Sequence, residues 1–410
     1  MGLDFTSLIA EANAGEVDVQ LQLAELYENG IGVPVDRGQA ASWYKIAAEQ
    51  GSAKAQSHLG QLYIRGIGVP KDHVEAVAWL QKAADKGDPV AQANLAWCYQ
   101  EGLGVDRDYQ RSLQLYQEAS EQGHAGARYN LGYMHANGIG TAKDAAEAVK
   151  WYTLAAELGH SKAQLNVGMM HAQGIGTEMD LTAAAKWYSK GALNGYAKAQ
   201  YNLALMYSAG SGVNQNDDEA FNLHKKAADQ GYYKAQFNLG LFYLYGLGAE
   251  KDYKKAFDMF CKSASDGYPK AHYQMAKLYA QGAGVETNEI ESAKCYQWAA
   301  ERGYIKAQYR LGRLYMQGQG VQRDEAIACK WFEKSAMQGY VKAQYYLGVC
   351  HAKGISVSKD YLTAYAWLLL AAESGNNDMN ELLDSVAQKL GDEDKIEAIR
   401  LSNEWRSVYQ

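Results

Sequence analysis

The fold is decided by the segment GSAKAQSHLGQLYIRGIGVPKDHVEAVAWLQKAADK, residues 51–86, because its pattern recurs along nearly the whole chain. The segment begins with a glycine, and the same residue returns every 36 positions without an insertion. This series consists of Gly15, Gly51, Gly87, Gly123, Gly159, Gly195, Gly231, Gly267, Gly303, Gly339 and Gly375. We number each repeat from this glycine as position zero. So strict an interval predicts a repeat array and not a set of unrelated domains.

Each repeat carries two helical patterns. Ala55, Leu59 and Leu62 fall on one face of a first helix, and Ala76 and Trp79 fall on one face of a second. The segment between them supplies glycines that can adopt positive φ, followed by an aspartate that can cap the second helix. We interpret the recurring aspartates as N-caps and not as catalytic carboxylates: Asp72, Asp108, Asp144, Asp180, Asp252, Asp324 and Asp360.

The sequence therefore predicts an all-α fold, a right-handed α/α superhelical solenoid of ten 36-residue helix-pair repeats with terminal capping helices. Residues 1–14 form the N-terminal capping helix in this prediction, the repeats fill residues 15–374, and residues 375–410 form the C-terminal capping helices. The predicted repeats are 15–50, 51–86, 87–122, 123–158, 159–194, 195–230, 231–266, 267–302, 303–338 and 339–374.

Composition narrows the class of protein. The net charge is −7 and the pI about 5.8, which argues against a nucleic-acid partner. No run of 18 apolar residues occurs, and the first residues lack the features of a signal peptide, so we expect no membrane span and a cytoplasmic location. Five cysteines occur without a CxxC pair, and we expect free thiols in a reducing compartment. They are Cys98, Cys261, Cys295, Cys329 and Cys350.

The pattern AQxxLGxLYxxGxGVxxDxxxAxxWYxxAAxxG, seen in residues 55–87, resembles the Sel1-like repeat family, a branch of the tetratricopeptide-like solenoids. The resemblance covers roughly residues 15–375. It implies a scaffold that binds other proteins and needs no cofactor. A secreted branch of that family carries paired cysteines in each helix pair; this chain lacks that pattern and resembles the intracellular members instead.

Catalytic and metal-binding patterns are weak. No HExxH, GxSxG, Walker-type loop or dinucleotide fingerprint appears. His135 and His171 stand where other repeats have tyrosine, and we interpret both as core substitutes and not as metal ligands. We therefore expect no catalytic residue, no metal and no cofactor; a hydrolase remains a remote alternative.

The resemblance implies that the first helix of each pair lines a concave face. Position 7 then presents five asparagines, whose amides can both donate to and accept from the backbone of an extended peptide. The alternative is a structural ladder that links successive repeats. The five are Asn94, Asn130, Asn166, Asn202 and Asn238.

Aromatic and basic side chains accompany the asparagines. Positions 6 and 10 carry rings that can anchor a partner or pack between repeats. These are Trp97, Tyr129, Tyr133, Tyr201, Phe237, Tyr273, Tyr309 and Tyr345. Lysines at position 3, with Lys198 and Lys234 in the candidate site, can attract an acidic segment or can be ordinary solvated residues at a helix start. Glutamines at position 5 are expected to form hydrogen bonds across repeats.

The sequence thus predicts a non-enzymatic adaptor whose concave groove binds a protein or an extended, possibly acidic, peptide segment. The alternative is a regulator in bacterial signalling, stress or host interaction that uses the same surface.

Overall fold

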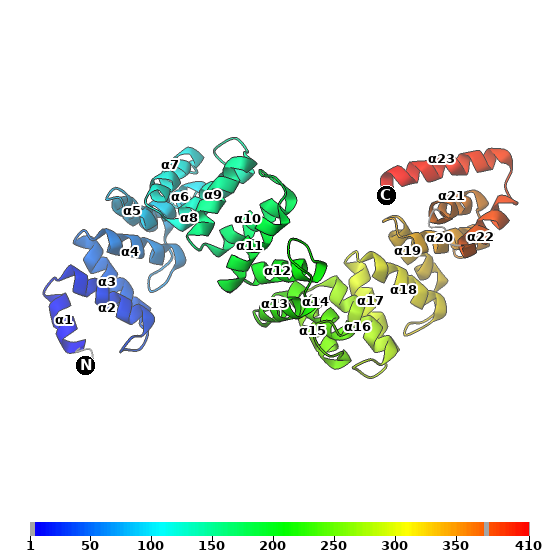
Figure 1. Cartoon of the computed structure of the whole chain (residues 1–410), viewed down its shortest axis with the longest axis horizontal. Coiled ribbons are helices and arrows are strands. Elements are labelled where there is room, and N and C mark those ends of the chain that lie inside the picture. Colours follow the sequence, from blue (N-terminus) through cyan, green and yellow to red (C-terminus); the bar gives the residue numbers. More distant parts are fainter. Residues whose placement is uncertain (1–4, 373–376, 410) are drawn as a thin grey trace. The chain divides into compact units, whose positions relative to one another are not determined.

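The computed structural model describes residues 5–372 and 377–409, and within them the chain forms 23 helices and no strand (Figure 1). Residues 1–4, Gly375 and the start of the predicted C-terminal cap lie outside this range. The chain divides into two compact units, residues 1–215 and residues 216–410, with the boundary between α12 and α13.

The helices alternate between two kinds. The first helix of each pair, called the A helix, is α2 (Val17–Asn29), α4 (Ala53–Arg65), α6 (Pro89–Glu101), α8 (Ala125–Asn137), α10 (Ser161–Gln173), α12 (Ala197–Ala209), α14 (Tyr233–Tyr245), α16 (Pro269–Gln281), α18 (Ile305–Gln317) or α20 (Val341–Lys353). The second, called the B helix, is α3 (Arg37–Glu49), α5 (His73–Ala84), α7 (Tyr109–Glu121), α9 (Ala145–Glu157), α11 (Leu181–Leu193), α13 (Asp217–Asp229), α15 (Tyr253–Ser265), α17 (Glu289–Glu301), α19 (Glu325–Ala336) or α21 (Tyr361–Ala372).

Terminal helices flank the array. Helix α1 (Phe5–Asn13) packs on α2, and both α22 (Asn377–Ala387) and α23 (Asp392–Tyr409) pack on α21. The helix-pair fold that the sequence predicts is confirmed. Within each unit an A helix packs against the B helix that follows it and against the B helix of the preceding repeat. The core is therefore a continuous row of contacts between neighbouring repeats.

The loop chemistry follows the prediction. Asp72 accepts hydrogen bonds from the backbone N–H groups of Val74 and Glu75, and each of the other predicted aspartates accepts one or two at the start of its own B helix. The A helix ends on a glycine in the left-handed region, as at Gly66 with φ 66°. Both features satisfy backbone groups that a helix end leaves without partners.

A second loop glycine brings successive repeats together. Gly104, with φ +73°, lies so close to the preceding repeat that a Cβ atom there would stand 2.1 Å from the His73 carbonyl oxygen. The same arrangement recurs at Gly68, Gly176, Gly212, Gly248, Gly284 and Gly320. Ser356 occupies the equivalent position with φ 59° and is the single non-glycine residue with positive φ in the described chain. This glycine is needed for close backbone approach as well as for the turn.

Position 5 links the repeats by side-chain hydrogen bonds. Gln56 Nε2 donates to the Ala48 carbonyl at 3.0 Å, and Gln164 Nε2 donates to the Ala156 carbonyl at 3.0 Å. Gln200, Gln236, Gln308 and Gln344 repeat this bond. Where arginine replaces glutamine, Arg128 Nε donates to the Ser120 carbonyl at 3.2 Å. The predicted cross-repeat role of this position is confirmed for these residues.

Candidate functional site

The predicted binding residues all lie on A helices. We call the surface of these helices that is turned away from the B helices the A-helix face. In residues 1–215 the predicted residues come from α6, α8, α10 and α12, and in residues 216–410 from α14, α16, α18 and α20. Their burial and contacts separate those that are available to a partner from those that are engaged within the fold.

The asparagine at position 7 lies against a buried residue of the preceding repeat. The Asn166 amide reaches the hydroxyls of Tyr129 and Tyr152, and it opposes the rise that burial imposes on the pKa of both tyrosines. Asn202 does the same for Tyr188, whose pKa burial raises to about 12. These amides therefore provide a hydrogen-bonding partner for tyrosine hydroxyls that the packing has removed from water.

The same relation joins other repeats, always with a residue 14 positions earlier. Asn130 approaches the buried Tyr116 hydroxyl without a well-aligned hydrogen bond, and Asn238 Nδ2 lies 3.5 Å from His224 Nε2. Burial lowers the pKa of His224 to about 4. The asparagine series thus forms a ladder between repeats in both units.

Asn94 differs because the residue 14 positions before it is Leu80, which has no polar group. Its Nδ2 instead donates to the Val90 carbonyl of its own helix at 2.9 Å. Two repeats that lack the asparagine pair rings at the same two positions. Tyr44 stacks on His58 at 4.9 Å, and Phe332 stacks on Tyr346 at 5.0 Å.

The aromatic residues at position 6 also contact the next repeat. The ring of Tyr129 stacks on that of His160, with 4.6 Å between the ring centres, and Tyr273 contacts Tyr304 with 5.2 Å between the ring centres. Similar ring contacts join Phe237 to Tyr268 and Tyr309 to Tyr340. Phe237 is 9% exposed and Tyr309 6%. Tyr129, Tyr201, Tyr273 and Tyr345 are half-buried. Most of the surface of these rings is used in packing.

Position 10 is different because its side chains on α8, α10 and α12 are well exposed. Tyr133 is 41% exposed, and at the equivalent position of the next two A helices Met169 is 39% and Leu205 40% exposed. Trp97, half-buried on α6, begins the same row. The sequence indicated Trp97 and Tyr133 but not Met169 and Leu205, because only the aromatic residues at this position have the type that usually anchors an interface. We call these four residues the apolar row.

A hollow of about 310 Å³ lies between α10 and α12. It is lined by Met169 and Leu205 of the apolar row, by Asn202, and by Tyr188 at its side. Asn202 is thus the one predicted asparagine among the residues that line this hollow. It lies among apolar groups of the kind that partner side chains require.

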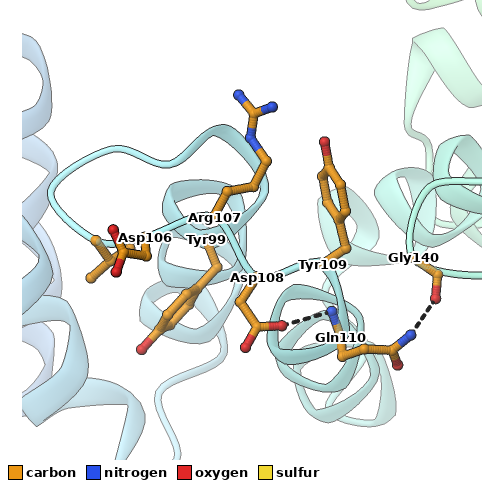
Figure 2. Close-up of a pocket in the computed structure, with 8 residues that line it drawn as sticks. Tyr99, Asp106, Arg107, Asp108, Tyr109, Gln110 and Gly140 are labelled. Carbon is orange, nitrogen blue, oxygen red and sulfur yellow. Dashed lines mark hydrogen bonds between the residues drawn. The ribbon is translucent and has the colours of Figure 1, made fainter.

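A larger hollow, of about 620 Å³, lies over the loop before α7 (Figure 2). Figure 2 shows Asp108 and Gln110 turned toward backbone groups, while Arg107 and Tyr109 extend away from them. Asp108 accepts from the Gln110 backbone N–H at 3.0 Å, and Gln110 Nε2 donates to the Gly140 carbonyl at 2.8 Å. These polar groups serve the turn and the junction with the next repeat.

The two candidate lysines lie on different units. Lys198 on α12 is exposed, and the Lys234 ammonium on α14 lies 6.0 Å from the centre of the Tyr233 ring. Neither forms an ion pair with another residue in the described part of the chain. Both remain available to a partner.

The prediction of five free thiols is wrong for one pair. Cys329 on α19 and Cys350 on α20 form a disulfide, with Cα atoms 6.4 Å apart. No spacing within one repeat indicates this pair, because the two cysteines face each other across the junction of two repeats. Cys98, Cys261 and Cys295 are free, and burial raises the pKa of each to about 11. The distinction drawn from the absence of paired cysteines therefore fails.

The histidines have local roles. His124 Nδ1 accepts from the Ala127 N–H at 3.0 Å, and His160 Nδ1 accepts from the Ala163 N–H at 3.2 Å, so both cap their A helices. His135 and His171 are partly buried, each with an Nδ1 atom that lacks a hydrogen-bond partner. Among the described residues no three His, Cys, Asp or Glu side chains gather as a metal site would require.

No described helix combines the length and apolar character that crossing a membrane requires.

Comparison with known proteins identifies the repeat. The family model described as "Sel1 repeat" matches ten times, at residues 17–52, 53–88, 89–124, 125–160, 161–196, 197–232, 234–268, 269–304, 305–340 and 341–376. No curated protein matches the chain.

Two solved structures are similar over much of their length. The protective antigen c5321 of uropathogenic Escherichia coli, which displays this repeat fold, is 33% identical, with a TM-score of 0.63 over 99% of this chain and 95% of that chain. A Sel1 repeat protein from Oxalobacter formigenes is 32% identical, with a TM-score of 0.61 over 77% of this chain and 93% of that chain. With ten matched repeats and two such relatives, the chain belongs to the Sel1 repeat family.

Proposed function

We propose that this chain is a non-catalytic scaffold that binds a segment of another protein along the A-helix face of residues 1–215. The observation that supports it is the apolar row, in which Tyr133, Met169 and Leu205 stand exposed at one equivalent position of three successive A helices. Exposed apolar side chains that adjoin one another are typical of interaction surfaces, whereas single ones are common everywhere.

Of the residues predicted from sequence, the proposal keeps Trp97, Tyr133 and Asn202 as contacts and adds Met169 and Leu205. The hollow between α10 and α12 would accept one apolar side chain of the partner, with the Asn202 amide available to its backbone. The other asparagines and the position-6 rings would act indirectly, because they hold the repeats in register.

The test compares two triple variants of the full chain. One carries Tyr133→Ser, Met169→Ser and Leu205→Ser in the apolar row. The matched control carries Leu154→Ser, Leu158→Ser and Leu193→Ser, which are 39%, 50% and 84% exposed on α9, its C-cap and α11 of the same unit. Each is used to capture proteins from cells that express the chain, and the captured proteins are quantified by mass spectrometry.

We expect a partner that the wild type and the control retain and that the row variant loses by about tenfold, since about 1.4 kcal/mol of binding free energy corresponds to that factor. Equal capture by all three proteins would remove the apolar row from the interface. Loss from both variants would mean that general surface hydrophobicity, and not this row, drives the capture.

The disulfide favours a second candidate, a regulator that acts outside the reducing cytosol. Disulfides persist in oxidising compartments, and the relative c5321 is described as a protective antigen. Labelling of the denatured, unreduced protein from its native source with a maleimide would distinguish the two locations. Three labels, on Cys98, Cys261 and Cys295, support the oxidising compartment, and five labels contradict it.

A further inference from the structure

The A helices of residues 216–410 carry cations and no carboxylate. Helices α14, α16, α18 and α20 contain no Asp or Glu, although the whole chain has a net charge of −7. Their basic residues are Lys234 on α14, Lys270 and Lys277 on α16, Lys306, Arg310 and Arg313 on α18, and Lys342 and Lys353 on α20. Negative charge is therefore absent from these four helices, whereas the B helices of the unit carry both signs, as with Lys254 and Asp258 on α15.

These cations have no internal counter-charge. None of them forms an ion pair with another residue of the described chain. Two carboxylates on neighbouring elements are engaged with other partners: Glu291 pairs with Lys294 at 2.6 Å, and Glu325 pairs with Arg323 at 2.5 Å. The four A helices therefore present positive charge without a carboxylate of their own to offset it.

Three of the cations converge. Lys277 of α16 is half-buried, and its pKa is lowered by that burial and by the positive charges of Arg310 and Lys306 on α18. No carboxylate contributes to this shift. Like charges held together without a counter-ion destabilise one another, so an anion bound among them would relieve that repulsion.

Tyrosines hold the two arginines in place. Arg310 lies beside Tyr273 and Tyr296, and Arg313 donates to the Tyr309 hydroxyl at 3.3 Å with its guanidinium 5.4 Å from the centre of the Tyr346 ring. A guanidinium that is already oriented loses less freedom when it binds a carboxylate in a forked, two-bond geometry.

We propose that Lys277, Lys306, Arg310 and Arg313 form a binding surface for an acidic polypeptide segment, whose side-chain carboxylates replace the missing counter-charges. A polypeptide fits better than a nucleic acid because rings near the cluster are committed to packing, with Tyr309 only 6% exposed, and offer no free face for base stacking. The acidic total charge of the chain also opposes a long polyanion. This surface is separate from the apolar row and does not depend on it.

The experiment measures fluorescence anisotropy of a labelled peptide of eight glutamates with the full chain, at low and at high salt. The first variant, Lys277→Gln with Arg310→Gln, removes two charges of the cluster. The control, Lys254→Gln with Lys262→Gln, removes two exposed charges from α15, a B helix of the same unit. Because Arg310 also contacts tyrosines, a third protein with Lys277→Gln and Lys306→Gln repeats the test, and circular dichroism verifies the fold of each.

We expect both cluster variants to bind the glutamate peptide about tenfold more weakly, the control to change less than about twofold, and high salt to weaken the wild type. A glutamine peptide of equal length should not bind. Equal binding by the cluster variants and the control, or no binding by the wild type, would overturn the proposal. It would also be overturned if a single-stranded oligonucleotide bound more tightly than the glutamate peptide with the same losses in the variants.

Discussion

The A helices of residues 1–215 and those of residues 216–410 share one framework and present different chemistry. At position 10 the first unit has Trp97, Tyr133, Met169 and Leu205, whereas the second has lysine or arginine on α16 and α18. Tyr133, Met169 and Leu205 are 39–41% exposed, so residues at this position can differ with little effect on the packing. The shared framework therefore leaves the chemistry at this position free to differ between the two units.

Several buried partners of that face form matched pairs. In the first unit Tyr152 is paired with Asn166, and in the second Phe332 is paired with Tyr346. A polar hydroxyl is met by an amide, and an apolar ring is met by another ring. Packing thus constrains the two positions jointly, because a mismatched pair would leave a buried polar group without a partner.

Substitution of the loop glycine should have the largest effect. In Gly104→Ala the new Cβ would clash with the His73 carbonyl oxygen, and alanine would be forced to adopt a positive φ. We therefore expect the free energy of unfolding to fall by about 4 kcal/mol. Ser356→Gly, at the equivalent position in the second unit, should stabilise by less than about 1 kcal/mol. Urea denaturation followed by circular dichroism measures both, and a neutral Gly104→Ala would show that the repeats can shift apart.

The buried histidine should make stability depend on pH. Between pH about 6.5 and about 4 the unfolded chain binds a proton at His224 that the folded chain excludes, so the stability falls by about 3 kcal/mol as the pH decreases through this range. His224→Tyr recreates the tyrosine–asparagine pair and should remove that contribution. Urea denaturation of both proteins at several pH values isolates it, since the other histidines are shared. Identical pH slopes would contradict the assignment.

Repeat equivalence predicts a second disulfide. Cys98 stands at the position of Cys350, seven repeats earlier, and Val77 stands at the position of Cys329 and packs in the same cluster as Cys98. Val77→Cys should therefore form a bond with Cys98 and stabilise the first unit by about 2 kcal/mol. Mass spectrometry of the unreduced protein detects the bond. If the introduced thiol stays free after oxidation, the α5–α6 and α19–α20 junctions differ in geometry.

Substitution of an asparagine at position 7 should have the smallest effect on stability. Asn166→Ala leaves the hydroxyls of Tyr129 and Tyr152 without their amide partner. We expect the free energy of unfolding to fall by about 1.5 kcal/mol. Asn94→Ala removes a bond within one helix only and should cost less than about 0.5 kcal/mol. Denaturation curves compare the two variants, and equal losses would mean that Asn166 does not link the repeats.

Much of the framework was predictable from sequence because it rests on local rules that recur. The glycine interval, the capping aspartates such as Asp72 and the cross-repeat role of Gln56 all follow from spacing and residue type, and the structure confirms them. The candidate site was less predictable. Asn166 and Phe237 have the residue types of a binding surface, yet the structure places them against the neighbouring repeat.

The sequence by itself determined the helix pairs, their length and their caps, because these depend on interactions within about 36 residues that repeat ten times. Only the tertiary structure decided which side chains remain exposed and which distant ones meet, because both depend on how one repeat packs on the next. The pairing of Cys329 with Cys350 and the convergence of Lys277 with Arg310 are of this second kind. Neighbouring repeats bring together residues that no pattern within a single repeat connects.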